Sequence, residues 1–134
     1  MRDKLSVLKE YFGHDSFREG QDRITDSLLG GRDVLGIMPT GAGKSICYQV
    51  PALMFDGITI VVSPLISLMK DQVSALVQSG VAAAYINSSL THAQYLKVLQ
   101  NTESGKYKII YVAPERLCAP AFLGICRNLN ISMV

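Results

Sequence analysis

Apolar residues occur in short runs that alternate along the chain with stretches of helical periodicity. The runs cover residues 34–38, 58–62, 82–86, 109–112 and 131–134, and each has the length of a strand. They have no polar face, and the stretches between them are long enough for crossover helices, which predicts buried parallel strands. The fold class expected from this pattern is α/β, with a mostly parallel sheet flanked by helices.

Helical spacing is visible in four places. The first helix ends at Gly13, a second over residues 19–29 ends at Gly30, and a capping-box pattern of Thr91 and Gln94 begins another. The first helix is predicted from the helical spacing of Leu5, Leu8, Tyr11 and Phe12. A further helix, between the second one and the capping box, is predicted from an apolar face made by Leu65, Leu68, Met69, Val73, Leu76 and Val77. The last run, 131–134, has no loop or helix after it, so we expect the chain to stop inside a domain.

Composition narrows the class of protein without deciding its function. The 134 residues are 49% hydrophobic, which fits one globular core, and a net charge of +2 neither supports nor excludes nucleic-acid binding. Three cysteines without a C-x-x-C spacing argue against a disulfide framework or a zinc site. No apolar run approaches the roughly 20 residues that span a bilayer, and no secretory signal is visible. A cytoplasmic, nucleoid or nuclear location is expected.

The string M-P-T-G-A-G-K-S at residues 38–45 lies between a predicted strand and a predicted helix. Glycines allow backbone N–H groups to surround a phosphate, and the helix N-terminus favours the anion. Lys44 is the candidate catalytic cation for the β- and γ-phosphates, and Ser45 the candidate ligand for Mg²⁺. Met38 stands where the general phosphate-loop pattern has glycine, whereas P-T-G-x-G-K-S is typical of superfamily 2 helicases. A glycine-rich turn that merely precedes a helix is the alternative. The predicted ATP-binding residues here are Thr40, Gly41, Ala42, Gly43, Lys44 and Ser45.

Four further strings occur in the order expected for the same class. They are F-G-H-x-x-F-R-x-x-Q at 12–21, V-S-P-L-I-S-L-M-K-D-Q at 62–72, N-S-S at 87–89 and Y-V-A-P-E-R-L at 111–117. Together with the phosphate loop they resemble RecQ-type DNA helicases over essentially the whole chain. The string at 62–72 is the most specific to that family.

The first of these strings is similar to the adenine-recognition motif of the RecQ family. The resemblance implies that the amide of Gln21 pairs with the edge of adenine and that Arg18 and His14 lie against the base. The alternatives are that Gln21 opens a solvated helix and that Arg18 is a surface charge. Phe17 is expected in the core.

The other three strings follow predicted strands, where parallel sheets bind ligands. The resemblance implies contacts to the DNA backbone, which carry no base information and suit a motor that steps along any sequence. Leu65, Leu68 and Met69 are expected in the core. For Lys70 and Gln72, a solvated helix face is an equally good interpretation. Asn87 and Ser88 fit equally well as turn residues. Arg116 has the alternative of pairing with groups around Glu115. The candidate nucleic-acid contacts are Ser63, Pro64, Lys70, Gln72, Asn87, Ser88, Pro114 and Arg116.

The resemblance also implies an architecture: a RecA-like P-loop NTPase fold with helices on both faces of the sheet. The chain would be the N-terminal part of the first motor domain, with adenine-recognition helices at 1–31 and an incomplete core at 32–134. It implies ATP and Mg²⁺ as cofactors, single-stranded or partly duplex DNA and a second RecA-like domain as partners, 3′ to 5′ unwinding, and a role in recombination and repair.

The chain contains no adjacent pair of acidic residues, and in the family the D-E-A-H string follows the strand expected at 131–134. We therefore expect these 134 residues alone neither to hydrolyse ATP nor to unwind DNA. An RNA helicase of the same superfamily and a non-motor nucleotide-binding module remain the alternative functions.

Overall fold

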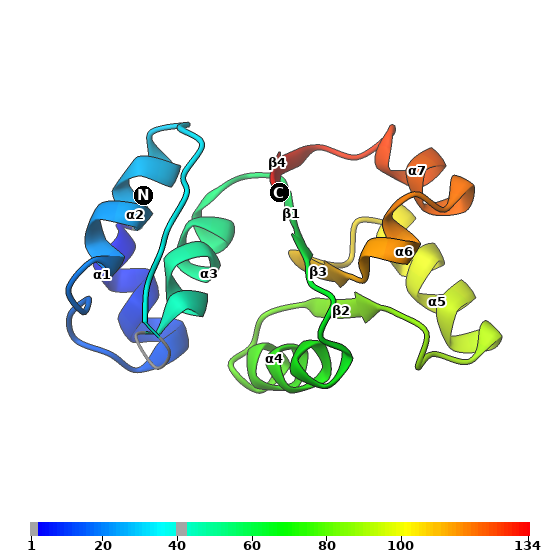
Figure 1. The fold of residues 1–134 in the computed structure, drawn as a ribbon, viewed down its shortest axis with the longest axis horizontal. Coiled ribbons are helices and arrows are strands. Elements are labelled where there is room, and N and C mark those ends of the chain that lie inside the picture. Colours follow the sequence, from blue (N-terminus) through cyan, green and yellow to red (C-terminus); the bar gives the residue numbers. More distant parts are fainter. Residues whose placement is uncertain (1–2, 40–42) are drawn as a thin grey trace. The chain divides into compact units, whose positions relative to one another are not determined.

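The structure is a computed structural model that describes residues 3–39 and 43–134 (Figure 1). The predictions for Thr40, Gly41 and Ala42 lie outside these residues. The chain divides into two compact units, Met1–Asp56 and Gly57–Val134. The predicted functional boundary at residues 31 and 32 is not tested by this division and stays a prediction.

The first unit is helical. Helix α1 (Lys4–Val7) continues into a π-helical turn, η1 (Leu8–Phe12), and α2 (Gln21–Leu29) and α3 (Lys44–Met54) follow. The carboxylate of Asp3 accepts a hydrogen bond from the backbone N–H of Ser6 at 2.7 Å and so caps α1. Val7, Leu8 and Val50 form the core of this unit. Phe17 packs against them, so its predicted core position is confirmed.

Residues 34–38 do not form the predicted strand, and that prediction was wrong. A strand needs a neighbour to pair its alternate backbone groups, and the described residues of the first unit provide none. The segment instead lies along α2, where a Cβ added at Gly36 would be 3.0 Å from Cδ1 of Ile24. Its other side faces outward, with Leu35 89% and Ile37 88% exposed.

The second unit contains a four-stranded sheet, in which the other four predicted runs all become strands. These are β1 (Ile58–Val62), β2 (Ala83–Ile86), β3 (Ile109–Val112) and β4 (Ile131–Met133). The strand order is β2-β3-β1-β4 and every pairing is parallel. Val112 of β3 lies opposite both Val62 of β1 and Ile86 of β2. The carboxyl ends of these three strands are therefore level at one edge.

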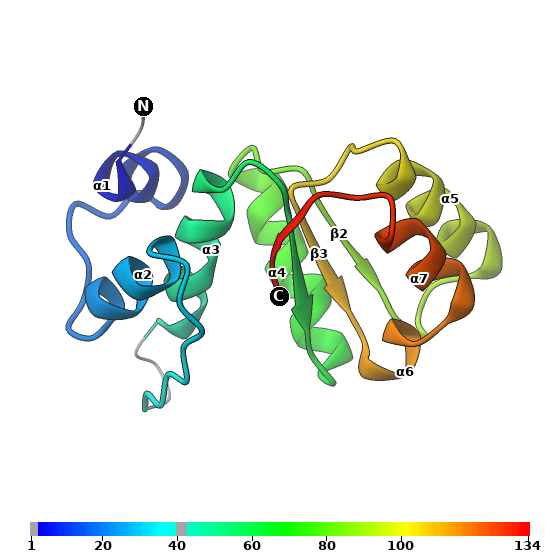
Figure 2. The same ribbon diagram turned by 90° about the horizontal axis from the view of Figure 1, so that it is seen from above.

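Helices cover both faces of this sheet, as expected (Figure 2). Helix α4 (Ile66–Gln78) packs on one face, and α5 (His92–Glu103), α6 (Pro114–Leu117) and α7 (Pro120–Cys126) lie on the other. On the α5 side, Phe122 and Leu99 pack against Ile60 and Ile110. The predicted capping box is confirmed, because Thr91 and Gln94 each bond the backbone N–H of the other. None of the helices described is long and apolar enough to cross a membrane.

Helix α4 buries a narrower stripe than predicted. Met69, Val73 and Leu76, spaced four and three residues apart, are buried. Leu65, by contrast, is 57% exposed and Leu68 43% exposed, so their predicted core positions were wrong. Leu65 precedes the helix, and Leu68, like the exposed Val77, lies off the stripe that meets the sheet. Apolar character alone therefore overstated the width of the buried face.

Candidate nucleotide and nucleic-acid sites

The first turn of α3 is the candidate phosphate site. Gly43 is its N-cap, with φ +75° in the left-handed region, and Lys44 and Ser45 begin the helix. The first N–H groups of a helix have no partner within it, and together with the helix dipole they favour an anion. Lys44 is exposed and Ser45 half-buried. The described part of the phosphate loop thus combines a helix N-terminus that favours anions, the exposed ammonium group of Lys44 and the hydroxyl of Ser45.

Gln21 joins the candidate adenine motif to the phosphate loop. Its side chain is 4% exposed, and its Nε2 donates to the carbonyl oxygen of Gly43 at 2.9 Å. Its Oε1 accepts from the backbone N–H of Arg18 at 2.8 Å. The solvated alternative for Gln21 is therefore wrong, because both ends of the amide are engaged at a buried position.

Two features favour glycine at position 43. Its φ of +75° is costly for a residue with a Cβ. In addition, a Cβ there would lie 2.5 Å from Nε2 of Gln21, so the end of the Gln21 side chain would have to move, and 3.8 Å from Nη1 of Arg18. The structure thus brings Arg18, Gln21 and Gly43 together around one point. His14 does not join them: it is exposed and makes no hydrogen bond or ring contact with the described residues.

The residues present suit a metal held mainly by a bound nucleotide. No group of three or more histidine, cysteine, aspartate or glutamate side chains in the described ranges could hold an ion. Mg²⁺ commonly binds through one or two protein oxygens together with substrate phosphates. The hydroxyl of Ser45, in the first turn of α3, is of that kind.

The candidate nucleic-acid residues gather at the level carboxyl ends of the strands. The backbone N–H of Ser63, after β1, donates to the carbonyl of Val112 at 3.1 Å, and that of Ala113 donates to Ile86 at 2.9 Å. These two bonds extend the pairing past the ends of β1, β2 and β3 and hold the following turns. Ser63 Oγ accepts from the N–H of Leu65 at 3.2 Å, which shapes the turn into α4. Pro64, Ser88 and Pro114 are exposed along the same edge.

Asn87 shapes this edge from within. It is fully buried, and its Oδ1 accepts from the backbone N–H of Ser89 at 2.9 Å and from Ser89 Oγ at 2.5 Å. Its Nδ2 lies 3.7 Å from Sδ of Met69 on α4. This burial argues against direct contact between the Asn87 side chain and a nucleic acid. The turn reading holds for Asn87, whose amide positions the exposed Ser88 beside it.

Gln72 and Arg116 are both oriented by tyrosines. The hydroxyl of Tyr111 on β3 donates to Oε1 of Gln72 at 3.0 Å. The guanidinium of Arg116 lies 4.9 Å from the ring centre of Tyr95, a cation–π contact. Lys70 is exposed on the first turns of α4. Sequence reasoning gave neither tyrosine a role, although Tyr111, inside an apolar strand, signals that its hydroxyl needs a partner.

Comparison with known proteins assigns the class. The sequence profile of the DEAD/DEAH box helicase family matches residues 18–132, which is most of the chain. The chain belongs to this family, which uses ATP.

Within the family, the chain is similar to proteins named ATP-dependent DNA helicase RecQ. It is 49% identical over 130 residues to the one from Bacillus subtilis and 52% identical over 118 residues to the one from Haemophilus influenzae. The predicted RecQ resemblance is confirmed. These matches cover 96% and 88% of this chain but 22% and 19% of the relatives, so the chain spans about a fifth of their length.

A solved structure confirms the fold class. The crystal structure of a hypothetical ATP-dependent RNA helicase from Sulfolobus tokodaii matches with a TM-score of 0.74 and 22% identity. The match covers 93% of this chain and 38% of that one. At this identity the likeness concerns the fold alone.

Proposed function

We propose that this chain is the ATP-binding part of a RecQ-type DNA helicase, in which ATP hydrolysis drives translocation along DNA and unwinding. Mg²⁺ accompanies the nucleotide, and a second RecA-like domain completes the motor. The 3′ to 5′ direction and a role in recombination and repair belong to the same proposal. Identities of 48–52% to RecQ DNA helicases support it.

The observation that carries the nucleotide half is the contact between Gln21 and Gly43. The Gln21 amide bonds the backbone of both Arg18 and Gly43, so it ties the adenine motif to the N-cap of α3. In this proposal Gln21 exchanges these bonds for the edge of adenine when the nucleotide binds, which links recognition of the base to the shape of the phosphate site. In the proposed site the α3 N-terminus binds the phosphates, Lys44 neutralises the β- and γ-oxygens, and Ser45 holds the metal. Arg18 lies beside Gly43, where its planar guanidinium can cover one face of the base. His14, which has no contact with Arg18, Gln21 or Gly43 among the described residues, joins the base site in this proposal only when the nucleotide is bound.

The nucleic-acid half rests on the level strand ends. The turns after the strands offer two hydroxyls, from Ser63 and Ser88, and the backbone carbonyls of Pro64 and Pro114. The helices that follow these turns add two cations, Lys70 on α4 and Arg116 on α6. Gln72 adds an amide held by Tyr111. Such groups bind sugar and phosphate without reading bases.

Substitution of Lys44 tests the phosphate site. In the full-length protein, Lys44→Ala removes a charge-assisted hydrogen bond worth about 1.5–3 kcal/mol, which corresponds to about 10- to 150-fold in ATP affinity or turnover. Lys106→Ala, at an exposed lysine outside the site, is the matched control and should behave as the unmodified protein. Unchanged ATP binding and hydrolysis in Lys44→Ala would contradict the assignment.

DNA-dependent hydrolysis separates the proposal from its two alternatives. A DNA helicase hydrolyses ATP faster with single-stranded DNA than with RNA of the same sequence. Stimulation by RNA alone would favour an RNA helicase. Nucleotide binding without any stimulation or strand separation would favour a non-motor module.

A further inference from the structure

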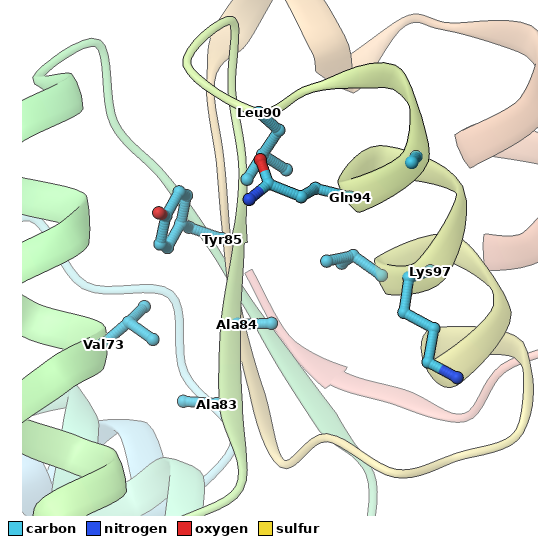
Figure 3. Close-up of a pocket in the computed structure, with 9 residues that line it drawn as sticks. Val73, Ala83, Ala84, Tyr85, Leu90, Gln94 and Lys97 are labelled. Carbon is cyan, nitrogen blue, oxygen red and sulfur yellow. The ribbon is translucent and has the colours of Figure 1, made fainter.

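A groove of about 500 Å³ lies along β2, between α4 and α5 (Figure 3). It belongs wholly to the second unit, and none of the residues that line it is a candidate DNA contact. Strand β2 is the first in the order β2-β3-β1-β4. Among the described residues it is therefore paired on one side only, and the groove follows its other side.

The backbone of β2 presents hydrogen-bonding groups to this groove. The carbonyl oxygens of Ala82 and Ile86 accept bonds from Lys108 and Ala113 on the β3 side, at 2.7 and 2.9 Å. In a parallel pair, alternate residues point their N–H and C=O to the same neighbour, so Ala84 also faces β3. The N–H and C=O groups of Ala83 and Tyr85 therefore point away from β3, to the open edge. An open edge of this kind is a template for another strand.

The side chains divide the groove into two apolar halves, one on each side of β2. Val73 of α4 lies on one side with Ala83 and Tyr85, and Ala84 lies on the other side with α5 (Figure 3). The α5 half is completed by Leu90 and Val98. The two alanines keep the groove open, since larger side chains there would fill it. A strand laid along β2 would direct successive side chains alternately into these halves.

The rim of the groove is positively charged. Lys97 of α5 is the one charged residue among the described residues that line it. Lys97 is exposed and has no ion pair or hydrogen bond within the described part of the chain. Gln94 Oε1 is engaged by the N–H of Thr91, which holds the Gln94 amide beside β2 (Figure 3). The rim thus complements a carboxylate.

We propose that the open edge of β2 binds an extended peptide of another protein, with apolar residues at its centre and acidic residues beside them. The peptide adds a strand to the sheet by bonding the backbone of Ala83 and Tyr85. Its consecutive apolar side chains enter the two halves of the groove, and an acidic side chain meets Lys97. None of the residues of this site is among those proposed for nucleotide binding.

The test uses the full-length protein and a fluorescein-labelled peptide of sequence D-V-I-V-I-D. The peptide binds, and amide hydrogen exchange at Ala83 and Tyr85 slows by about tenfold or more, because these N–H groups gain partners. Lys97→Glu weakens binding about three- to tenfold and strengthens binding of the peptide K-V-I-V-I-K. The matched control Lys106→Glu leaves both affinities unchanged. Ala93→Trp, at an exposed residue that lines the groove, abolishes binding by filling it.

Two methylated peptides test the backbone pairing itself. Each carries N-methyl groups on one of the two alternating sets of backbone nitrogens. In a strand that pairs along one edge, only every second N–H group faces the partner strand. The peptide methylated at those nitrogens should therefore lose binding, and the other peptide should keep it. The proposal is overturned if neither unmethylated peptide binds, if both methylated peptides bind equally well, or if Lys97→Glu and Lys106→Glu act alike. A concentration-dependent dimer that Ala93→Trp abolishes, without peptide binding, would also overturn it in favour of a second copy of this chain.

Discussion

Replacement of Gly43 by alanine should disturb the link between the two nucleotide motifs. Gly43 has φ +75°, and a Cβ at this position would lie 2.5 Å from Nε2 of Gln21. Gly13 provides a matched control, because its φ is +72° and an added Cβ there meets nothing within 4 Å. The two substitutions share the backbone strain and differ in the clash.

The size of each effect follows from these two terms. A left-handed conformation costs a residue with a Cβ about 1–2 kcal/mol, which is the expected loss for Gly13→Ala. Gly43→Ala adds the displacement of Gln21 and the loss of its 2.9 Å bond to Gly43, worth about 1 kcal/mol. We therefore expect Gly43→Ala to lower the free energy of unfolding by about 2–3 kcal/mol.

Urea denaturation of four proteins measures the coupling: the unmodified chain, Gly43→Ala, Gln21→Ala and the double variant. Once Gln21 is alanine, the clash and the bond are both absent, so Gly43→Ala should cost only about 1–2 kcal/mol. The coupling energy is then about 1 kcal/mol. Equal costs of Gly43→Ala in both backgrounds would refute the reasoning, and so would equal costs of Gly43→Ala and Gly13→Ala.

Two further predictions concern buried groups. Asn87→Ala removes the oxygen that accepts hydrogen bonds from the N–H and the hydroxyl of Ser89, and it should lower the free energy of unfolding by about 1–3 kcal/mol. Ser88→Ala, at the exposed neighbour, should change the free energy of unfolding little. Equal effects of the two substitutions in urea denaturation would contradict the positioning role of Asn87. Burial raises the pKa of the Cys47 thiol, so at pH 8 less of it is thiolate and iodoacetamide should label the exposed Cys118 first and Cys47 last. Faster labelling of Cys47, followed by peptide mass spectrometry, would show that α3 opens readily.

Much of the fold could be predicted from local pattern because period and cap chemistry act within a few residues. Four apolar runs became strands of one parallel sheet, and the Thr91–Gln94 cap formed as predicted. The phosphate loop was recognisable because its glycines and Lys44 stand at fixed spacing before a helix. The RecQ resemblance rested on strings of this kind, and the comparisons confirm it.

Other features depended on tertiary contacts. Residues 34–38 have the composition of a buried strand but lack a pairing neighbour within their unit, so Leu35 and Ile37 are exposed. Likewise, the sequence does not say how wide a stripe of α4 the sheet covers, which left Leu65 and Leu68 outside the core. Strand pairing and burial are properties of two partners, and a run of residues specifies only one of them.

For the candidate sites too, some features could be predicted from sequence and others depended on tertiary contacts. Residue type and spacing predicted Lys44 and Ser45, and the RecQ resemblance predicted Gln21, as residues of a nucleotide site. Only the tertiary structure showed that the amide of Gln21 bonds the carbonyl of Gly43, 22 residues away, and that Asn87 is buried beneath its turn. The direction of a side chain depends on the groups around it, and those groups come from distant parts of the chain. Sequence therefore determined which chemical groups are available, and the packing of helix on helix and helix on sheet decided which of them are buried and which are exposed.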